Sequence, residues 1–153
     1  MKLYFLRHGK ADWPDWDRPD DERPLTKQGK KEMRRVAELL RELEVEPALI
    51  LSSPLPRALQ TAEIVAERLS IELKQDPALA PGFSRANLQK ILSRTRKRDL
   101  MIVGHEPDFS MTITALTGGR IKLAKGGLAR VDLDNPAGDG RLVWLIPPAA
   151  ATC

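Results

Sequence analysis

Three apolar runs of four residues, at 3–6, 48–51 and 100–103, are each followed at once by polar or small residues. Short runs of this kind are typical of strands that are buried on both faces of a parallel sheet. The carboxyl ends of parallel strands meet at one edge of a sheet, so residues far apart in the sequence can share a site there. The residues that follow the three runs are Arg7-His8-Gly9, Ser52-Ser53-Pro54 and Gly104-His105-Glu106. Both histidines of the chain therefore lie where such a site is expected.

The segments between the three apolar runs show the periodicity of helices. Thr26 is placed to cap a helix whose apolar residues continue to Leu43. A second apolar stripe covers residues 55–69 and predicts another helix. Arg57 and Thr61 are four residues apart, so they share a neighbouring face near the start of this helix. An arginine there can meet a phosphate beside the free amides of the helix N-terminus.

The remaining elements continue the alternation of strand and helix. We expect a short strand at 71–74, a loop at 78–84, a helix around residues 88–92, a helix from Pro107 to Leu116 that ends at Gly118-Gly119, and strands at 128–133 and 141–146 in a hairpin joined through Asn135-Pro136 and Gly138. The residues from Pro147 onward have little to bury. This order predicts an α/β fold, a three-layer α/β/α sandwich with a mainly parallel sheet.

Taken together, these motifs resemble those of the histidine phosphatase superfamily, which has the phosphoglycerate mutase-like fold. The residues that carry the resemblance are Arg7-His8-Gly9, Ser52-Ser53-Pro54 with Arg57, Gln60, Thr61 and Ala62 after it, and Gly104-His105. Within the superfamily, residues 7–11, 25–29 and 125–130 are most similar to the SixA-type phosphohistidine phosphatases. The resemblance covers nearly the whole chain and implies a three-layer sandwich in which one strand is antiparallel.

The resemblance implies that His8 is a nucleophile, which attacks phosphorus to form a phosphohistidine that water then cleaves. A neutral imidazole is competent for this attack at physiological pH. In the resembled family a backbone carbonyl just after the histidine holds its other ring nitrogen as a donor, and Gly9 is expected to supply it here. Phosphoryl transfer places charge on three equatorial oxygens. The planar guanidinium groups of Arg7 and Arg57 can donate paired hydrogen bonds to these oxygens, and His105 can serve as a third donor.

Four further residues have two interpretations each. Ser53 and Thr61 either contact the phosphate or only cap and hydrogen-bond their helix. Glu106 either acts in the site beside His105 or is an acid at the N-terminus of the following helix. Lys125 either borders the site or lies in an exposed turn.

The leaving group favours phosphohistidine over a phosphate ester as the substrate. Larger superfamily members that cleave esters carry a glutamate or aspartate in the loop after the third strand or beside the second histidine. Here the loop at 79–84 has no carboxylate, and Glu106 and Asp108 are the residues that could substitute. An ester oxygen leaves as a strong base, whereas ring-protonated phosphohistidine leaves as neutral imidazole, whose conjugate acid has a pKa of about 6.5. A P–N bond therefore needs less acid catalysis.

Residues 12–24 form an acidic segment just after His8, which we expect to border the pocket. Its excess negative charge would disfavour small polyanions and tolerate a macromolecular substrate. The other interpretation is a solvated surface loop whose two tryptophans cover the core.

Composition narrows the classes of partner and compartment. The net charge is +4, but the charges are interleaved except at 94–98, a cluster that we interpret as a solvated helix end and not as a nucleic-acid site. The single cysteine, Cys153, fits a reducing compartment. No apolar run approaches the roughly 20 residues of a membrane span, and no signal region is evident. We therefore expect one cytoplasmic, monomeric domain over residues 1–153, with no nucleic-acid or membrane partner.

The sequence thus predicts a phosphohistidine phosphatase that acts on signalling or phosphotransfer proteins and releases inorganic phosphate. No metal or cofactor is expected, because two histidines without a cysteine or carboxylate at ligand spacing make a poor zinc site. The first alternative is a broad phosphomonoesterase on small esters, with Glu106 or Asp108 as the acid. The second is a non-catalytic phosphoprotein-binding module, although such a module has no need of a nucleophile.

Overall fold

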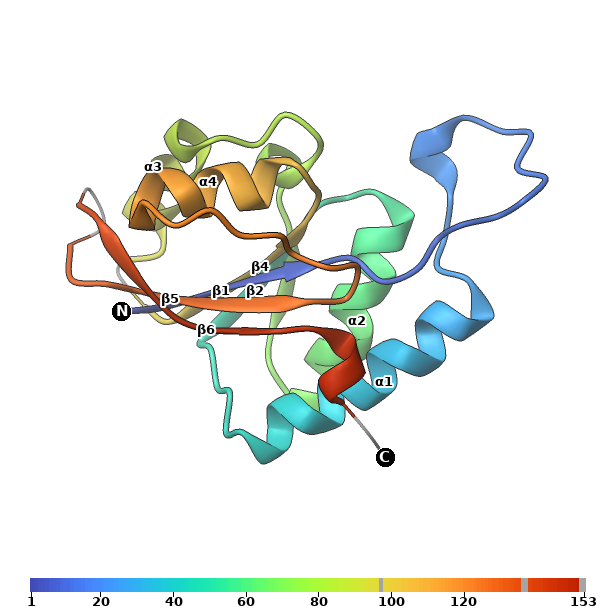
Figure 1. Ribbon diagram of the computed structural model, residues 1–153, viewed down its shortest axis with the longest axis horizontal. Coiled ribbons are helices and arrows are strands. Elements are labelled where there is room, and N and C mark those ends of the chain that lie inside the picture. Colours follow the sequence, from blue (N-terminus) through green and yellow to red (C-terminus); the bar gives the residue numbers. More distant parts are fainter. Residues whose placement is uncertain (97, 136–137, 152–153) are drawn as a thin grey trace.

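The computed structural model describes residues 1–96, 98–135 and 138–151 (Figure 1). Three residues used in the sequence analysis, Lys97, Pro136 and Cys153, lie outside the described ranges. Within these ranges six strands form one sheet in the order β3-β2-β4-β1-β5-β6. The strands are β1 (Lys2–Arg7), β2 (Leu49–Ser52), β3 (Leu73–Gln75), β4 (Leu100–Gly104), β5 (Leu128–Leu133) and β6 (Gly140–Ile146).

Two pairs of helices cover the two faces of the sheet (Figure 1). One pair is α1 (Lys27–Glu42) with α2 (Pro56–Leu69), and the other is α3 (Arg85–Arg94) with α4 (Asp108–Thr117). Alternate residues of β1 serve the two layers, since Leu3 and Phe5 pack with α3 and α4 whereas Tyr4 and Leu6 pack with α1 and α2. The predicted three-layer α/β/α sandwich is therefore confirmed. None of the described helices is both long enough and apolar enough to cross a membrane.

The sheet is mixed, which corrects the prediction of a mainly parallel one. Strand β1 pairs in parallel with β4, and β2 pairs in parallel with both β3 and β4. Strand β5 runs antiparallel to its two neighbours, β1 and β6. The physical reason is the hairpin between β5 and β6, because a hairpin reverses the chain and therefore pairs its strands in antiparallel. The antiparallel strand that the resemblance implies is β5.

Local signals set most helix boundaries. Thr26 caps α1, and its hydroxyl oxygen accepts a hydrogen bond from the Gly29 N–H at 3.0 Å. Helix α1 ends at Glu42, so Leu43 is an exposed cap residue and not the last member of the buried stripe. Helix α4 begins directly after Pro107, as the sequence indicates.

The end of the described chain contributes to the core, contrary to the expectation that it buries little. After β6 the chain forms the short helix η3 (Pro148–Ala150), which lies against α1. The next residue, Ala151, is buried in the core that α1 and α2 share. Alanine is small and only weakly hydrophobic, so the burial of Ala151 was not evident from the sequence.

Candidate active site

The candidate site lies at the carboxyl edge of three adjacent parallel strands. The register places Arg7 of β1 beside Gly104 of β4, so the next residues, His8 and His105, leave the sheet side by side. The centroids of these two imidazole rings are 5.4 Å apart. Ser53 is the first residue beyond β2, and its N–H donates to a β4 carbonyl at 2.9 Å. The structure thus brings together residues that lie more than fifty positions apart in the chain.

His8 is held as a neutral imidazole with one defined donor nitrogen. Its side chain is buried, and Nδ1 lies 2.7 Å from the Gly9 carbonyl oxygen. Because a carbonyl oxygen only accepts, Nδ1 carries the proton and Nε2 keeps its lone pair. Burial is the main cause that lowers the pKa of His8 to about 3, and the Gly9 carbonyl opposes this shift. The nearby His105, Arg57 and Arg7 lower the pKa further.

The Gly9 carbonyl is fixed in place by its surroundings. A Cβ atom at Gly9 would lie 2.8 Å from Met33 Cγ, so a larger residue does not fit without a shift. The Gly9 N–H donates to Thr61 Oγ1 at 3.0 Å, and the Thr61 hydroxyl donates to the Arg57 carbonyl at 2.8 Å. The only proton of this hydroxyl is therefore used within the protein. Thr61 hydrogen-bonds its own helix, as one of its two interpretations had it, and it also ties the His8 segment to α2, which neither interpretation included.

Two guanidinium groups lie beside the histidines, that of Arg57 buried and that of Arg7 partly buried. Arg57, in the first turn of α2, donates from Nη1 to the Asp20 carbonyl at 3.2 Å, and Arg7 donates from Nη1 to the Leu123 carbonyl at 3.0 Å. Their Nε atoms are buried and have no hydrogen-bond partner among the residues that the structure describes. Burial lowers the pKa of both groups. Buried N–H donors without a partner on two neighbouring cations are typical of an anion site, because an oxyanion would satisfy both their charge and their hydrogen bonds.

Ser53 and His105 form a hydrogen-bonded pair. Nε2 of His105 lies 2.8 Å from the Ser53 hydroxyl oxygen, which also accepts from the Leu55 N–H at 3.2 Å. Nδ1 of His105 is buried without a partner in the described part of the chain. When Ser53 donates its proton to Nε2, the proton of the neutral ring resides on Nδ1, which is then a free donor. Burial is the main cause that lowers the pKa of His105 to about 4, and Arg57 adds to the shift while Asp108 opposes it.

The two carboxylates beside the second histidine hold backbone amides. Glu106 accepts from the Ser110 N–H at 2.7 Å and also from the Ser110 hydroxyl. Asp108 accepts from the Gly82 N–H at 2.8 Å. Glu106 therefore caps the first turn of α4, which agrees with its interpretation as an acid at the N-terminus of that helix.

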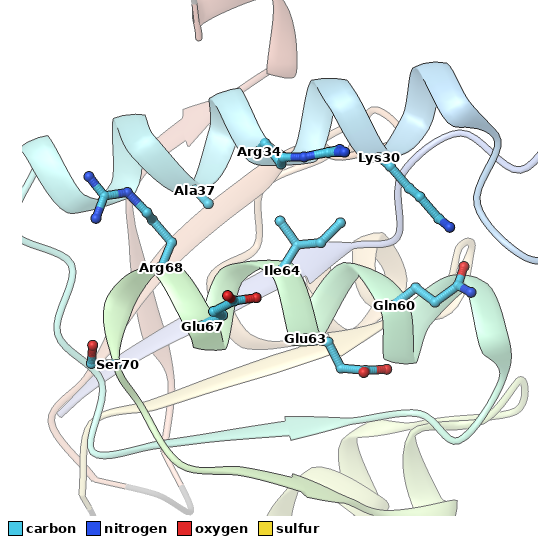
Figure 2. A pocket seen from close by; sticks show the side chains of 9 residues that line it. All are labelled: Lys30, Arg34, Ala37, Gln60, Glu63, Ile64, Glu67, Arg68 and Ser70. Atoms are coloured by element: carbon cyan, nitrogen blue, oxygen red, sulfur yellow. The ribbon is translucent and has the colours of Figure 1, made fainter.

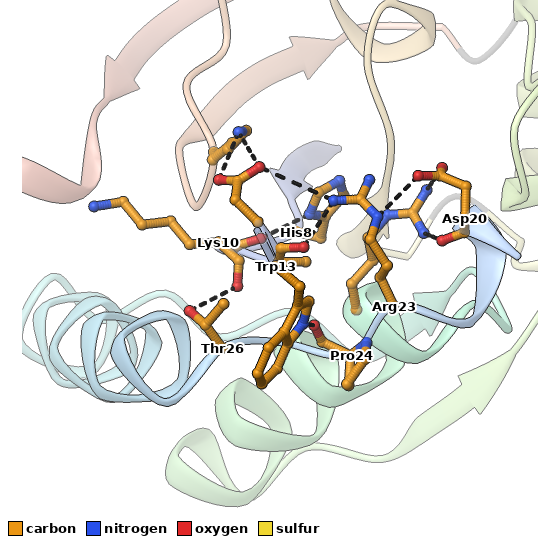
Figure 3. A network of polar contacts seen from close by, with 12 residues as sticks. His8, Lys10, Trp13, Asp20, Arg23, Pro24 and Thr26 are labelled. Carbon is orange, nitrogen blue, oxygen red and sulfur yellow. Dashed lines mark hydrogen bonds and ion pairs between the residues drawn. The ribbon is translucent and has the colours of Figure 1, made fainter. Parts of the chain in front are cut away.

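Arg23 borders the site, as expected for residues 12–24 as a whole, although nothing in the sequence singled out this arginine. Its Nη1 donates to the Ala11 carbonyl at 2.7 Å, and its Nε lies 2.8 Å from the Asp20 carboxylate (Figure 3). After burial, the positive charge of Arg23 is the next cause that lowers the pKa of Arg57. No periodic pattern covers residues 12–24, so the sequence offered no signal for where this arginine would lie.

The acidic segment at 12–24 is tied to the loop before β5. Nζ of Lys125 lies 2.9 Å from both carboxylate oxygens of Asp12, so Lys125 borders this segment. The rings of Trp13 and Trp16 pack on each other, with centroids 6.2 Å apart, and Trp13 is exposed. One interpretation of the sequence was that the two tryptophans cover the core. The structure contradicts it.

A separate groove of about 920 Å³ lies between α1 and α2 (Figure 2). Charged side chains of both signs line it, with Lys30 and Arg34 on α1 and Glu63 and Glu67 on α2. None of the predicted site residues lines this groove. His8 and the unsatisfied donors of Arg7, Arg57 and His105 lie at the sheet edge, so we assign the candidate site to that edge.

Comparisons with known proteins relate this chain to one family. The sequence model of the histidine phosphatase superfamily (branch 1) matches residues 3–80. The chain is 37% identical over 140 residues to an uncharacterized protein of Picosynechococcus sp., covering 84% of this chain and 82% of that protein. It is 30% identical over 156 residues to the phosphohistidine phosphatase SixA of Escherichia coli, covering 97% and 94% of the two chains. A solved structure of the protein histidine phosphatase SixA complexed with tungstate is similar with a TM-score of 0.88 and 28% identity, over 99% of this chain and all of that one.

Proposed function

Because the chain belongs to the histidine phosphatase superfamily, we propose that it removes phosphate from phosphohistidine side chains of signalling or phosphotransfer proteins, with His8 as the nucleophile. The observation that carries the proposal is the 2.7 Å contact between His8 Nδ1 and the Gly9 carbonyl. This contact leaves the Nε2 lone pair free, and the ring lies among Arg7, Arg57 and His105.

In the first step, the Nε2 lone pair of His8 attacks phosphorus and forms a new P–N bond. The P–N bond to the substrate imidazole breaks, and that ring leaves with the bonding electron pair. The substrate ring is protonated on its other nitrogen, so it departs as neutral imidazole. Arg7 and Arg57 stabilise the charge on the equatorial oxygens, and His105 donates a further hydrogen bond.

In the second step, the oxygen of a water molecule attacks the phosphorus of the phosphorylated enzyme. The bond between phosphorus and Nε2 breaks, and its electron pair returns to His8. The water proton passes to solvent or to the departing phosphate, so the enzyme regains neutral His8 with Nδ1 still protonated. Dividing one displacement into two in this way is typical of covalent catalysis.

The surroundings of Glu106 and Asp108 support a P–N substrate. Both carboxylates accept hydrogen bonds from backbone N–H groups, so each has a role other than donating a proton to a leaving group. An alkoxide leaving group needs such a proton, whereas neutral imidazole does not. Arg7, Arg57 and His105 already supply charge stabilisation, so the proposed reaction requires no metal.

The decisive experiment measures phosphate release from a histidine phosphotransfer domain labelled with ³²P on its histidine. An alkyl phosphate monoester is tested in parallel, and His8→Ala is the control. We expect rapid release from the protein substrate, little turnover of the ester and no release by His8→Ala. Acid-labile label on the wild-type enzyme, absent from His8→Ala, would identify the covalent intermediate.

Two other outcomes would replace the proposal. Faster turnover of the ester would indicate a small-molecule phosphomonoesterase. Binding of the phosphorylated domain without turnover of either substrate would indicate a phosphoprotein-binding module.

A further inference from the structure

A chain of charged side chains with alternating sign runs beside His8, across two loops and the start of α2 (Figure 3). Its members, in order, are Lys125, Asp12, Arg23, Asp20 and Arg57. The successive N···O distances are 2.9, 4.0, 2.8 and 3.8 Å. This row of charges ends at Arg57, the buried arginine of the proposed phosphate site.

Asp20 is bound unequally by its two arginines. Its carboxylate lies 2.8 Å from Arg23 Nε but 3.8 Å from Arg57 Nη2. A phosphate that binds Arg57 can therefore replace the longer ion pair while Asp20 keeps the shorter one with Arg23. In such a complex the carboxylate of Asp20 remains beside the bound phosphate.

Burial places this carboxylate at the rim of the site. The side chain of Arg57 is 7% exposed, that of Arg23 is 22% exposed, and that of Asp20 is 72% exposed. Asp20 begins the short helix η1 (Asp20–Glu22), which lies next to the first turn of α2. The part of a substrate that surrounds its phosphate would meet Asp20 before it reached the buried guanidinium group of Arg57.

We propose that Asp20 is a specificity-determining residue, whose carboxylate on Arg23 selects phosphate groups with no further negative charge beside them. The inference rests on the proposed function for the location of the phosphate site. It names the substrate class more closely, as phosphohistidine flanked by neutral or basic side chains. Phosphate carriers with a second anionic group near the phosphate are disfavoured, because that group and Asp20 repel each other.

The test measures binding of two non-hydrolysable ligands, phenylphosphonate and 4-carboxyphenylphosphonate, by titration calorimetry. Wild-type protein should bind the carboxylate-bearing ligand more weakly. Asp20→Asn should reduce the ratio of the two dissociation constants by about three- to fivefold, the size of a partly screened interaction at the protein surface. Asp20→Glu should keep the wild-type ratio.

Asp17→Asn is the matched control, because Asp17 lies in the same segment and has no ion pair within the described residues. It should leave the ratio unchanged. The same ratio in Asp20→Asn as in wild type, or an equal reduction in Asp17→Asn, would overturn the proposal. Circular dichroism and thermal unfolding verify that each variant folds.

This design separates the two proposals, since binding of the phosphonates requires no turnover. Selectivity that depends on Asp20 in a protein that fails to hydrolyse phosphohistidine would leave the role of Asp20 standing, and would remove the proposed function together with phosphohistidine as the substrate. An unchanged ratio in a protein that hydrolyses phosphohistidine would remove this inference and leave the proposed function standing. Absence of binding by either phosphonate would contradict the phosphate site on which both depend.

Discussion

The Thr61 hydroxyl oxygen lies 3.0 Å from the Gly9 backbone nitrogen, and through this contact α2 holds the residue that orients His8. Thr61→Val removes the acceptor and leaves a buried N–H unpaired, which costs about 1–3 kcal/mol of stability. We expect kcat to fall with little change in the binding of inorganic phosphate, and Thr61→Ser to restore kcat. A loss confined to phosphate affinity would instead indicate that Thr61 contacts the substrate.

The buried environment of the two histidines predicts that neither is protonated in the ligand-free enzyme near neutral pH. Burial is the main cause that lowers the pKa of His8 to about 3 and that of His105 to about 4. Below these values the rings become cationic, so the nucleophile is lost only in strong acid. The chain has two histidines, so NMR of their ring C–H groups, assigned with His105→Asn, follows each titration directly. A midpoint near 6.5 for His8 would contradict this prediction.

Arg57 is predicted to act through its planar fork as well as its charge. Arg57→Ala should lower kcat/KM for phosphohistidine by about 10²–10³-fold, because a preorganised donor to the transferring phosphoryl group is removed. Arg57→Lys should recover only part of this loss, since an ammonium group cannot form two parallel hydrogen bonds. Steady-state kinetics measures both, with thermal unfolding as the check on folding. Activity of Arg57→Ala within tenfold of wild type would exclude it from the catalytic set.

Gly9→Ala should impair both stability and catalysis. The added Cβ would lie 2.8 Å from Met33 Cγ and 3.1 Å from its sulfur, so the backbone or the core must shift. Overpacking of this kind costs about 1–3 kcal/mol. A shift of the Gly9 carbonyl would also release Nδ1 of His8 and lower kcat. In the double variant with Met33→Ala, which removes the clashing atoms, kcat should recover even though the core is less stable, and purely additive effects would contradict this account.

Glu106→Gln distinguishes a phosphohistidine phosphatase from an ester phosphatase. The glutamine side chain keeps an oxygen that can accept from the Ser110 N–H, so the fold should be retained. We expect release of phosphate from phosphohistidine to be nearly unchanged, because neutral imidazole leaves without a proton donor. If Glu106 were the acid for ester cleavage, the substitution would reduce the rate by about 10²–10⁴-fold. Parallel assays on both substrates compare the two outcomes.

Much of the architecture could be predicted from local patterns. The strand at 128–133 has the predicted bounds, Thr26 caps α1, and α4 begins after Pro107. The strand expected at 71–74 instead covers Leu73–Gln75, at an edge of the sheet where its residues are mostly exposed and the apolar signal is weak. The hairpin makes one antiparallel pair in any arrangement, and a second arises because β5, and not β6, lies beside β1. Local periodicity does not specify that choice.

The sequence by itself determined that His8, Ser53 and His105 follow strands and that Arg57 begins a helix, because apolar runs and their ends are local features. Only the tertiary structure decided which groups meet: Thr61 with Gly9, His105 with Ser53, and Asp20 with both Arg57 and Arg23. The first two contacts each join residues 52 positions apart. The lowered pKa values of the histidines likewise arise from burial among distant side chains. Such contacts depend on packing and desolvation, which no short stretch of sequence encodes.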